Sequence, residues 1–117
     1  IVLHALSDSI YGAIANGDIG THFPSNDKNL NIHSSEILSH AHKMLEASDY
    51  QISNVDITIV LEKPRLQDFI LEMRENISRL ISLDIDRISI KSSTSQKIGL
   101  IGNNQAIACY SSILVKK

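Results

Sequence analysis

The segment from Gln51 to Glu62 constrains the fold most, because apolar and polar residues alternate along it. One side carries only apolar residues: Val55, Ile57, Ile59 and Leu61. The other side carries Asp56, Thr58 and Val60. A repeat of two residues is typical of a β-strand with one buried face. Lys63-Pro64-Arg65 ends this strand, since proline cannot donate a hydrogen bond to a neighbouring strand.

Helical and extended segments surround this strand. Apolar residues recur at three- and four-residue steps in three stretches, which predicts helices over residues 1–15, 34–47 and 67–83. Residues 21–32 are polar and contain Pro24, so we expect an ordered loop or a mobile flap. Two more strands are expected over residues 87–91 and 106–115, and between them a turn at 92–95 that opens a helical turn near Gln96 and Lys97. This order predicts an α+β fold, a two-layer sandwich with helices on one face of a mixed sheet.

The last of these strands is apolar or small on both of its faces. One face has Ile107, Cys109 and Ile113, and the other has Ala106, Ala108, Tyr110 and Leu114. A sheet that is covered on one side only usually shows a polar outer face. We therefore expect another subunit to cover the second face, so that sheets pack together in an oligomer.

Size and charge exclude several classes of protein. The 117 residues predict a single domain over 1–117. A net charge of -2 and 4% aromatic residues argue against a nucleic-acid partner, and no apolar run approaches the roughly 20 residues of a membrane span. The single cysteine, Cys109, lies in an apolar segment, which favours a small buried residue over a nucleophile and indicates a reducing compartment. The chain begins at Ile1 inside a helical pattern, so we expect an N-terminal segment that it does not show.

Histidines and a carboxylate on the predicted helices are candidates for metal chemistry. His4, Asp8 and Gly12 are four residues apart and share one helix face. A neutral imidazole on a rigid helix is a good zinc ligand, but catalytic zinc needs three protein ligands. Asp8 either orients the His4 ring or forms a surface ion pair. His40 and His42 point in different directions, and we expect both on the solvated surface.

Two loops carry further candidates. Asp18 lies between Gly17 and Gly20, whose lack of side chains permits close approach to the backbone. Its carboxylate either binds substrate hydroxyls or caps its own backbone. The run from Lys91 to Lys97 combines hydroxyls, two lysines and the amides of an expected helix start, which favours a phosphate site. Ordinary capping explains its serines and Thr94 equally well.

Several short motifs follow one another along the chain. They are His4-Ala-Leu-Ser-Asp8, Gly17-Asp18-Ile19-Gly20, Phe23-Pro24, Asn54-Val55-Asp56-Ile57-Thr58-Ile59, Glu62-Lys63-Pro64-Arg65-Leu66, Met73-Arg74 and Ser93-Thr94-Ser95-Gln96-Lys97-Ile98-Gly99. Together they resemble the methylerythritol cyclodiphosphate synthase family of isoprenoid precursor biosynthesis. The match spans essentially the whole chain, in register apart from a one-residue deletion within residues 21–32.

The resemblance implies a homotrimer with active sites between neighbouring subunits and the activity of a zinc-dependent phosphorus–oxygen lyase. Such an enzyme cyclises 4-diphosphocytidyl-2-C-methyl-D-erythritol 2-phosphate to 2-C-methyl-D-erythritol 2,4-cyclodiphosphate and releases CMP. One zinc ion, held by two His and one Asp, aligns the phosphates, and a second ion, Mg²⁺ or Mn²⁺, bridges the diphosphate. The bacterial cytoplasm is the implied compartment, with a plastid-type organelle as the alternative.

The resemblance also implies roles for individual residues. His4 matches the helix-borne zinc ligand, and Thr94 matches the residue that supports the phosphates in the transition state. Asp18 and Gly20 match residues that hold the methylerythritol hydroxyls, and Asp18 joins Thr94 as a catalytic candidate. Residues 23–27 match the flap and 61–67 the cytidine pocket. The implied substrate-binding set is Asp18, Ile19, Gly20, Phe23, Pro24, Asp27, Leu61, Pro64, Arg65, Leu66, Ser92, Ser93, Thr94, Ser95, Leu100 and Asn103.

The chain departs from the family pattern at several positions. The family's other two zinc ligands, an Asp-x-His motif, and its His-Ser-Asp-Gly stretch have no counterpart here. Gln96 stands where a Glu usually binds the second metal, and an amide is a weaker ligand for a hard cation. Arg65 replaces a common Lys, and Asn103 replaces an Arg of the trimer's central cavity. These departures leave an alternative open, a non-catalytic trimeric small-ligand-binding protein of the same architecture.

Overall fold

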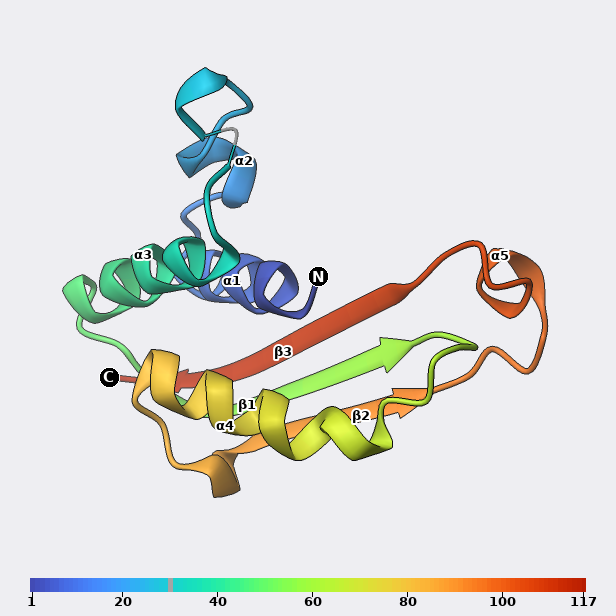
Figure 1. Cartoon of the computed structure of the whole chain (residues 1–117). Coiled ribbons are helices and arrows are strands. Elements are labelled where there is room, and N and C mark those ends of the chain that lie inside the picture. Colours follow the sequence, from blue (N-terminus) through green and yellow to red (C-terminus); the bar gives the residue numbers. More distant parts are fainter. Residues whose placement is uncertain (30) are drawn as a thin grey trace.

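The computed structural model describes residues 1–29 and 31–117, except for the side chain of Asp27. Its strands form one sheet in the order β2–β1–β3 (Figure 1). The central strand β1 (Gln51–Val60) runs parallel to β2 (Ile88–Ser93) and antiparallel to β3 (Ala108–Lys116). The expected mixed sheet is therefore confirmed.

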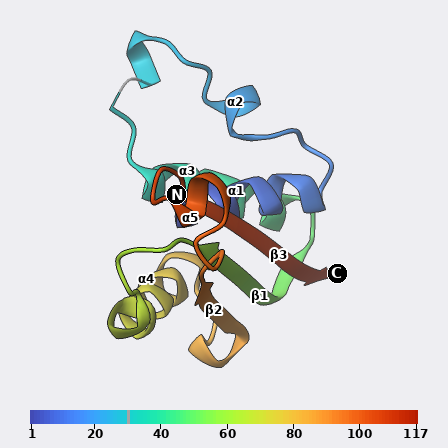
Figure 2. The same ribbon diagram turned by 90° about the vertical axis from the view of Figure 1, so that its right-hand side faces the viewer.

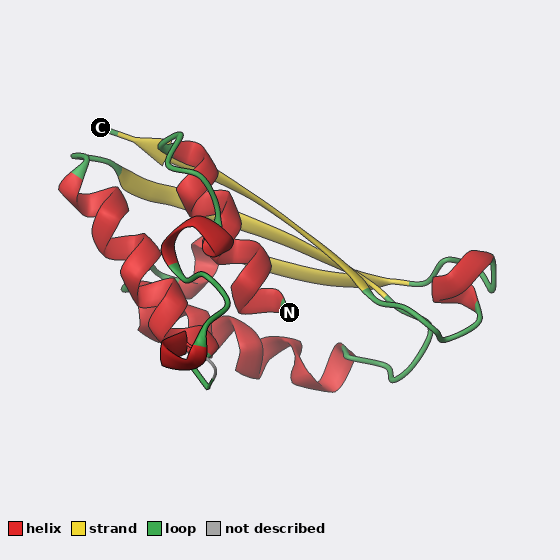
Figure 3. Ribbon diagram, turned by 90° about the horizontal axis from the view of Figure 1, so that it is seen from above, coloured by secondary structure: helices red, strands yellow, loops and turns green. Residues whose placement is uncertain are grey.

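Long helices cover one face of this sheet, as Figure 3 shows. α1 (Val2–Ala13) packs on α3 (Ser34–Ala47) and on β3, whereas α4 (Ile70–Ile81) packs on β2. Their apolar stripes form one core with the sheet, and the side chains at its centre are each at most 3% exposed: Leu6, Ile10, Leu38, Leu45, Ile77 and Ile81. The α+β class predicted from the order of elements is confirmed.

The alternation along β1 is visible in the structure. Val55, Ile57 and Ile59 face the helices and are at most 2% exposed. Ile52 is also buried, which breaks the two-residue repeat, because the pairing with β3 shifts register between Ile52 and Asn54. An extra residue in one strand turns the following side chains to the other face. The bulge therefore lets both ends of β1 contribute to the core.

The segment after β2 differs from the expectation. The strand continues through Ser93, and the expected helical turn near Gln96 and Lys97 is wrong, because both residues have left-handed φ values of 53° and 65°. The helical turn, α5, lies at Gly99–Gly102. The loop is compact, since a Cβ on Gly102 would stand 2.1 Å from the carbonyl carbon of Lys97. Figures 1 and 3 show that this loop projects beyond the ends of the strands.

The polar segment after α1 contains short helices. α2 (Ile19–His22) begins directly after Asp18, and a 3-10 turn follows at Asp27–Asn29. Figure 2 shows this segment rising above α1 and α3, away from the sheet. The expectation for residues 21–32 also covers Leu30, which lies outside the described residues.

The second face of the sheet is left open by the helices. Tyr110 and Leu114 on β3 are 67% and 61% exposed there. The same face carries polar groups, because Lys91 Nζ lies 2.8 Å from Asp56 Oδ1. Ile107, expected within the last strand, precedes it. Within residues 1–29 and 31–117, no helix combines the length and apolar character that crossing a membrane requires.

Candidate functional site

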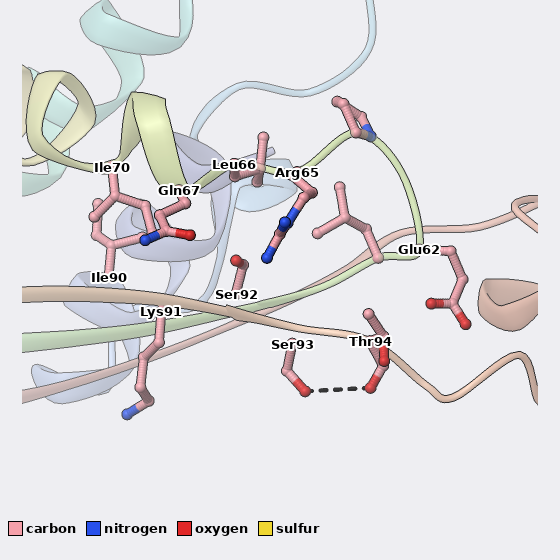
Figure 4. A pocket seen from close by; sticks show the side chains of 12 residues that line it. Glu62, Arg65, Leu66, Gln67, Ile70, Ile90, Lys91, Ser92, Ser93 and Thr94 are labelled. Atoms are coloured by element: carbon pink, nitrogen blue, oxygen red, sulfur yellow. Dashed lines mark hydrogen bonds between the residues drawn. The ribbon is translucent and has the colours of Figure 1, made fainter.

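A pocket of about 450 Å³ opens where β1 and β2 end beside the start of α4 (Figure 4). Its size lies in the range of small-molecule sites, roughly 300–1,000 Å³. The structure brings a large group of the residues named from the sequence to its walls: Leu61, Pro64, Arg65, Leu66, Ser92, Ser93 and Thr94. These residues come from the two strand ends, which the parallel pairing of β1 and β2 places side by side.

The pleat of β2 decides which of its side chains enter this pocket. Ser92 lies on the same face as buried Ile90, and Figure 4 shows the Arg65 guanidinium directed toward it. Lys91 and Ser93 point to the opposite face, where Lys91 donates to both carboxylate oxygens of Asp56 at 2.8 and 2.9 Å. Because successive side chains of a strand alternate, the run of serines is divided between two faces.

Thr94 follows the strand at the rim of the pocket. Its hydroxyl oxygen accepts the Gln96 N–H at 3.2 Å, so the hydroxyl proton can point to a ligand oxygen. The Glu62 carboxylate accepts the Lys97 N–H and so joins the end of β1 to this loop. Ser95 Oγ donates to the Ile98 carbonyl at 2.9 Å. Ser95 therefore closes its own turn, as the capping interpretation predicts.

Gln96, Leu100 and Asn103 lie farther along, in the projecting loop. Leu100 is 65% exposed and belongs to α5, and Asn103 ends that helix. The pocket walls come from residues 61–70 and 90–94, so these three candidates lie outside it.

Asp18 caps the N-terminus of α2. Its Oδ1 accepts from both the backbone N–H and the hydroxyl of Thr21, each at 2.9 Å. These hydrogen bonds lower the pKa of Asp18. Gly17 has a φ of 77°, and a Cβ there would stand 2.8 Å from Thr21 Oγ1, so the close approach requires glycine. The carboxylate is exposed and ionised, and its second oxygen can accept a ligand hydroxyl.

His4 is exposed on α1, and Asp8 forms a hydrogen bond with Ile19 rather than with His4. Asp8 Oδ1 accepts the Ile19 N–H at 2.9 Å, which fixes the start of α2 to α1. This contact is neither of the two roles expected for Asp8. In the described part of the chain, no three His, Cys, Asp or Glu side chains lie close enough to hold one metal ion. These residues therefore do not form a three-ligand zinc site by themselves.

Sequence reasoning missed an aromatic cluster formed by Tyr11, His22, Phe23 and His40. The Tyr11 side chain is fully buried, and its hydroxyl lies 2.7 Å from His40 Nδ1. His22 stacks on Tyr11 with a centroid distance of 4.4 Å, and Phe23 meets the His40 ring edge-on at 5.1 Å. The prediction that His40 lies on the solvated surface is wrong. Its partners come from three separate segments, which helical periodicity cannot pair.

The remaining flap candidates lie beside this cluster. The Pro24 carbonyl accepts from Asn29 Nδ2 at 2.9 Å, which holds the turn after α2. The side chain of Asp27 lies outside the described residues. Figures 1 and 2 place α2 and the turn after it beyond α1 and α3, away from the ends of β1 and β2. A single chain therefore does not bring Asp18 and its neighbours close to Thr94 and the other pocket residues.

Comparison with known proteins adds to this geometry. Residues 1–116 match the model of the YgbB family. The chain belongs to the YgbB family. Similar proteins that carry the name 2-C-methyl-D-erythritol 2,4-cyclodiphosphate synthase include those of Brachyspira hyodysenteriae and Buchnera aphidicola. That of Brachyspira hyodysenteriae is 49% identical over 117 residues, 99% of this chain and 74% of the relative. That of Buchnera aphidicola is 43% identical over 118 residues, 100% of this chain and 71% of the relative.

Solved structures of similar sequence share the fold of this YgbB chain. The bifunctional IspDF of Campylobacter jejuni superimposes with a TM-score of 0.93 at 36% identity, over 97% of this chain and 31% of that one. IspF of Plasmodium falciparum, solved as a CDP complex, gives a TM-score of 0.88 at 36% identity, over 98% of this chain and 69% of that one. The three-stranded mixed sheet and its helices are therefore the family fold.

Proposed function

We propose that this chain forms the active sites of a 2-C-methyl-D-erythritol 2,4-cyclodiphosphate synthase. The observation that carries the proposal is the pocket at the ends of β1 and β2. It brings Arg65 together with Ser92 and Thr94, although 26 residues of chain separate Arg65 from Ser92. The 49% identical relative of this name and the CDP complex of the Plasmodium falciparum protein support the same substrate class.

The proposed reaction closes a ring within 4-diphosphocytidyl-2-C-methyl-D-erythritol 2-phosphate. An oxygen of the 2-phosphate attacks the phosphorus next to the methylerythritol, and the bond from that phosphorus to the oxygen bridging to CMP breaks. CMP leaves with the electron pair, and 2-C-methyl-D-erythritol 2,4-cyclodiphosphate remains. Catalysis of such a transfer consists mainly of positioning and of stabilising phosphate charge.

In this proposal the pocket residues hold the nucleotide end of the substrate. The Arg65 guanidinium supplies a positive charge beside Ser92, where phosphate oxygens would lie. Thr94 donates its hydroxyl proton to a phosphate oxygen, since its own oxygen already accepts the Gln96 N–H. Asp18 accepts the methylerythritol hydroxyls, and its lowered pKa keeps it ionised for that task.

The family resemblance adds one zinc ion and a second ion, Mg²⁺ or Mn²⁺, to the proposal. His4 is the ligand that the described residues offer to zinc, and Gln96 is the candidate for the second ion. His4 is exposed but has no two further donors near it in the described residues, so these residues would supply zinc with a single ligand. Gln96→Glu should tighten the second ion, seen as a lower magnesium concentration for half-maximal rate. An unaltered magnesium dependence would count against this placement.

We propose a homotrimer with active sites between neighbouring copies. The Asp18 segment, residues 16–23, lies apart from the ends of β1 and β2 and from the projecting loop within one chain (Figure 1). The open face of the sheet leaves Tyr110 and Leu114 exposed, and packing of sheets from three copies would bury them. Light scattering should give the mass of three chains, and Leu114→Asp should lower it. A monomer at all concentrations would contradict the assembly.

The deciding experiment is release of CMP from the cytidylylated substrate by the purified protein with zinc and magnesium present. We expect turnover, with the cyclodiphosphate as the second product. The bacterial cytoplasm is the proposed setting. A non-catalytic ligand-binding protein remains the second candidate, because Gln96 replaces an acidic metal ligand. That candidate predicts saturable binding of CDP, measured by calorimetry, without any release of CMP.

A further inference from the structure

The aromatic cluster of Tyr11, His22, Phe23 and His40 lies between the Asp18 segment and the helices α1 and α3, and outside the pocket. We propose that Tyr11 and His40 are positioning residues that hold Asp18 in place through His22, and that they release it when His40 takes up a proton. The substrate-binding role of Asp18 rests on the proposed function. The pH-dependent contact between helices does not.

The cluster connects three helices across the base of the segment. Tyr11 projects from α1 and is fully buried, His40 projects from α3, and His22 lies in the last turn of α2. The Tyr11 ring carries the stacked His22 ring at 4.4 Å and an interplanar angle of 17°. The same Tyr11 donates or accepts a hydrogen bond with His40 Nδ1 at 2.7 Å. One buried side chain therefore sets the position of both imidazoles.

His22, which stacks on Tyr11, and Asp18 lie at opposite ends of the single turn of α2. α2 has four residues, with Asp18 as its N-cap and His22 as its last residue. His22 Nε2 lies 2.8 Å from the Asn16 carbonyl, which can only accept, so Nε2 carries a proton. This bond and the stack hold the end of α2, and the Asp8 contact to Ile19 holds its start. A shift of His22 would therefore move the backbone that carries Asp18.

The charges around His40 disfavour its protonated form. Burial is the main cause that lowers the pKa of His40, and the positive charges of His22 on α2 and Lys43 on α3 add to it. From α1, Tyr11 faces His40 as a neutral phenol, because burial and the nearby Asp8 raise the pKa of Tyr11. Neutral His40 thus accepts the Tyr11 proton at Nδ1. A proton on His40 would place its positive charge in a ring whose centroid lies 5.2 Å from that of His22.

The sign of the pH effect follows from the pKa of His40, which is lower in the closed cluster than in an opened one. An opened cluster returns His40 to water, where its pKa is near the ordinary value of 6.5. The open form then binds the proton more readily than the closed form does. The closed cluster is therefore fully favoured above about pH 6.5 and loses its advantage as the pH falls below that value.

Amide hydrogen exchange between pH 7.5 and 5.5 tests the proposal on the whole chain. We expect the protection factors of the Ile19 and Phe23 amides to fall below pH 6.5, by up to about tenfold per pH unit for one proton. The buried amide of Ile57 serves as an internal control for global unfolding. In His40→Gln the protection should stay constant with pH. The matched control is His42→Gln, because His42 lies on the same helix and pairs with Glu46 instead.

Retention of the full pH dependence in His40→Gln would overturn the proposal. Should that variant fail to fold, the wild-type protein decides by itself through NMR titration of its histidine rings. Loss of protection at Phe23 should follow the titration of His40, with a midpoint below 6.5. Protection that does not follow this titration would overturn the proposal as well.

A kinetic measurement tests the link to substrate separately. As the pH falls from 7.5 to 5.5, KM should rise several-fold more in the wild-type and His42→Gln proteins than in His40→Gln. The kcat profile should be the same in all three proteins. Identical KM profiles would refute the positioning of Asp18. A protein that releases no CMP would refute the proposed function, whereas the exchange experiment would still decide whether the cluster opens with pH.

Discussion

The Asp18 segment and the loop after β2 carry the two halves of the candidate site, and they are built in opposite ways. Contacts from the helical core hold the Asp18 segment, through Asp8 to Ile19 and through Tyr11 to His22. The loop at 94–105 is held mainly by its own backbone hydrogen bonds, and Ile98 and Leu100 are 74% and 65% exposed on it. One half of the site is thus positioned by its own chain, and the other extends into solvent.

This difference indicates which half of the candidate site would depend on the proposed trimer. A segment fixed to a buried tyrosine keeps its geometry in an isolated chain. A projecting loop with exposed apolar side chains needs a neighbouring surface to bury them. The proposed trimer would bring the projecting loop of one copy to the fixed segment of another. Changes in the two regions should therefore have different consequences for catalysis and stability.

The largest effect should come from Thr94→Ala. Removing a hydroxyl that donates to a phosphate oxygen in the transition state should lower the rate of CMP release on the order of 10²-fold. Thr94→Ser keeps the hydroxyl and should recover most of the rate. Steady-state kinetics on both variants measure this. Equal rates for Thr94→Ala and the wild type would remove Thr94 from the mechanism.

Gly102→Ala should have the next largest effect, because it tests whether the compact form of the projecting loop matters. The added Cβ would overlap the Lys97 backbone, so the loop must rearrange. A displacement of this kind should cost about tenfold in the rate of CMP release. The thermal unfolding temperature should change little, since Gly102 lies outside the core. A variant with the full rate would show that the loop geometry is unimportant.

A smaller effect is expected for Glu62→Gln. The glutamine oxygen can still accept the Lys97 N–H, but the bond loses its charge assistance. We expect a rate of CMP release about threefold lower, with unaltered stability to urea. Asp68→Asn is the matched control, because Asp68 is an exposed carboxylate in the short helix Gln67–Phe69 near the same pocket. Equal losses in both variants would point to net charge rather than to the loop contact.

The smallest effect should come from Gly12→Ala in the fixed region. A Cβ at Gly12 meets no atom within 4 Å, and the residue is exposed within α1. Alanine in a helix is favoured over glycine by about 0.5–1 kcal/mol. The free energy of unfolding in urea should rise by that amount, with CMP release unchanged. A destabilised Gly12→Ala protein would mean that the end of α1 is strained in a way the contacts do not show.

Particular elements show how far sequence patterns reach. The strand at residues 51–60 and the helices at 34–47 and 70–81 were predictable, because alternation and helical periodicity report which face of an element is buried. The wall of the pocket was predictable in part, because the resemblance named Arg65, Ser92 and Thr94. Predicting that Ser92 and Ser93 lie on opposite faces of the sheet would have required knowing that β2 continues through Ser93. The resemblance places both serines in one substrate-binding set.

The left-handed turn at Gln96 and Lys97 could not be predicted, because neither residue is glycine and local propensity disfavours that conformation. The aromatic cluster could not be predicted from the sequence for another reason. Tyr11 and His40 are 29 residues apart, and no periodic pattern relates them. Their contact exists only because α1 and α3 pack together on the sheet.

Local patterns of residues are enough to assign most helices and strands, the faces that they bury, and the family that the chain resembles. These properties depend on residues close together in the chain, where spacing and side-chain type decide the outcome. The folded structure was needed to show that Asp8 accepts the Ile19 N–H, that His40 contacts Tyr11, and that the two halves of the candidate site lie apart. Those contacts join distant residues, and packing between elements sets them rather than any local preference.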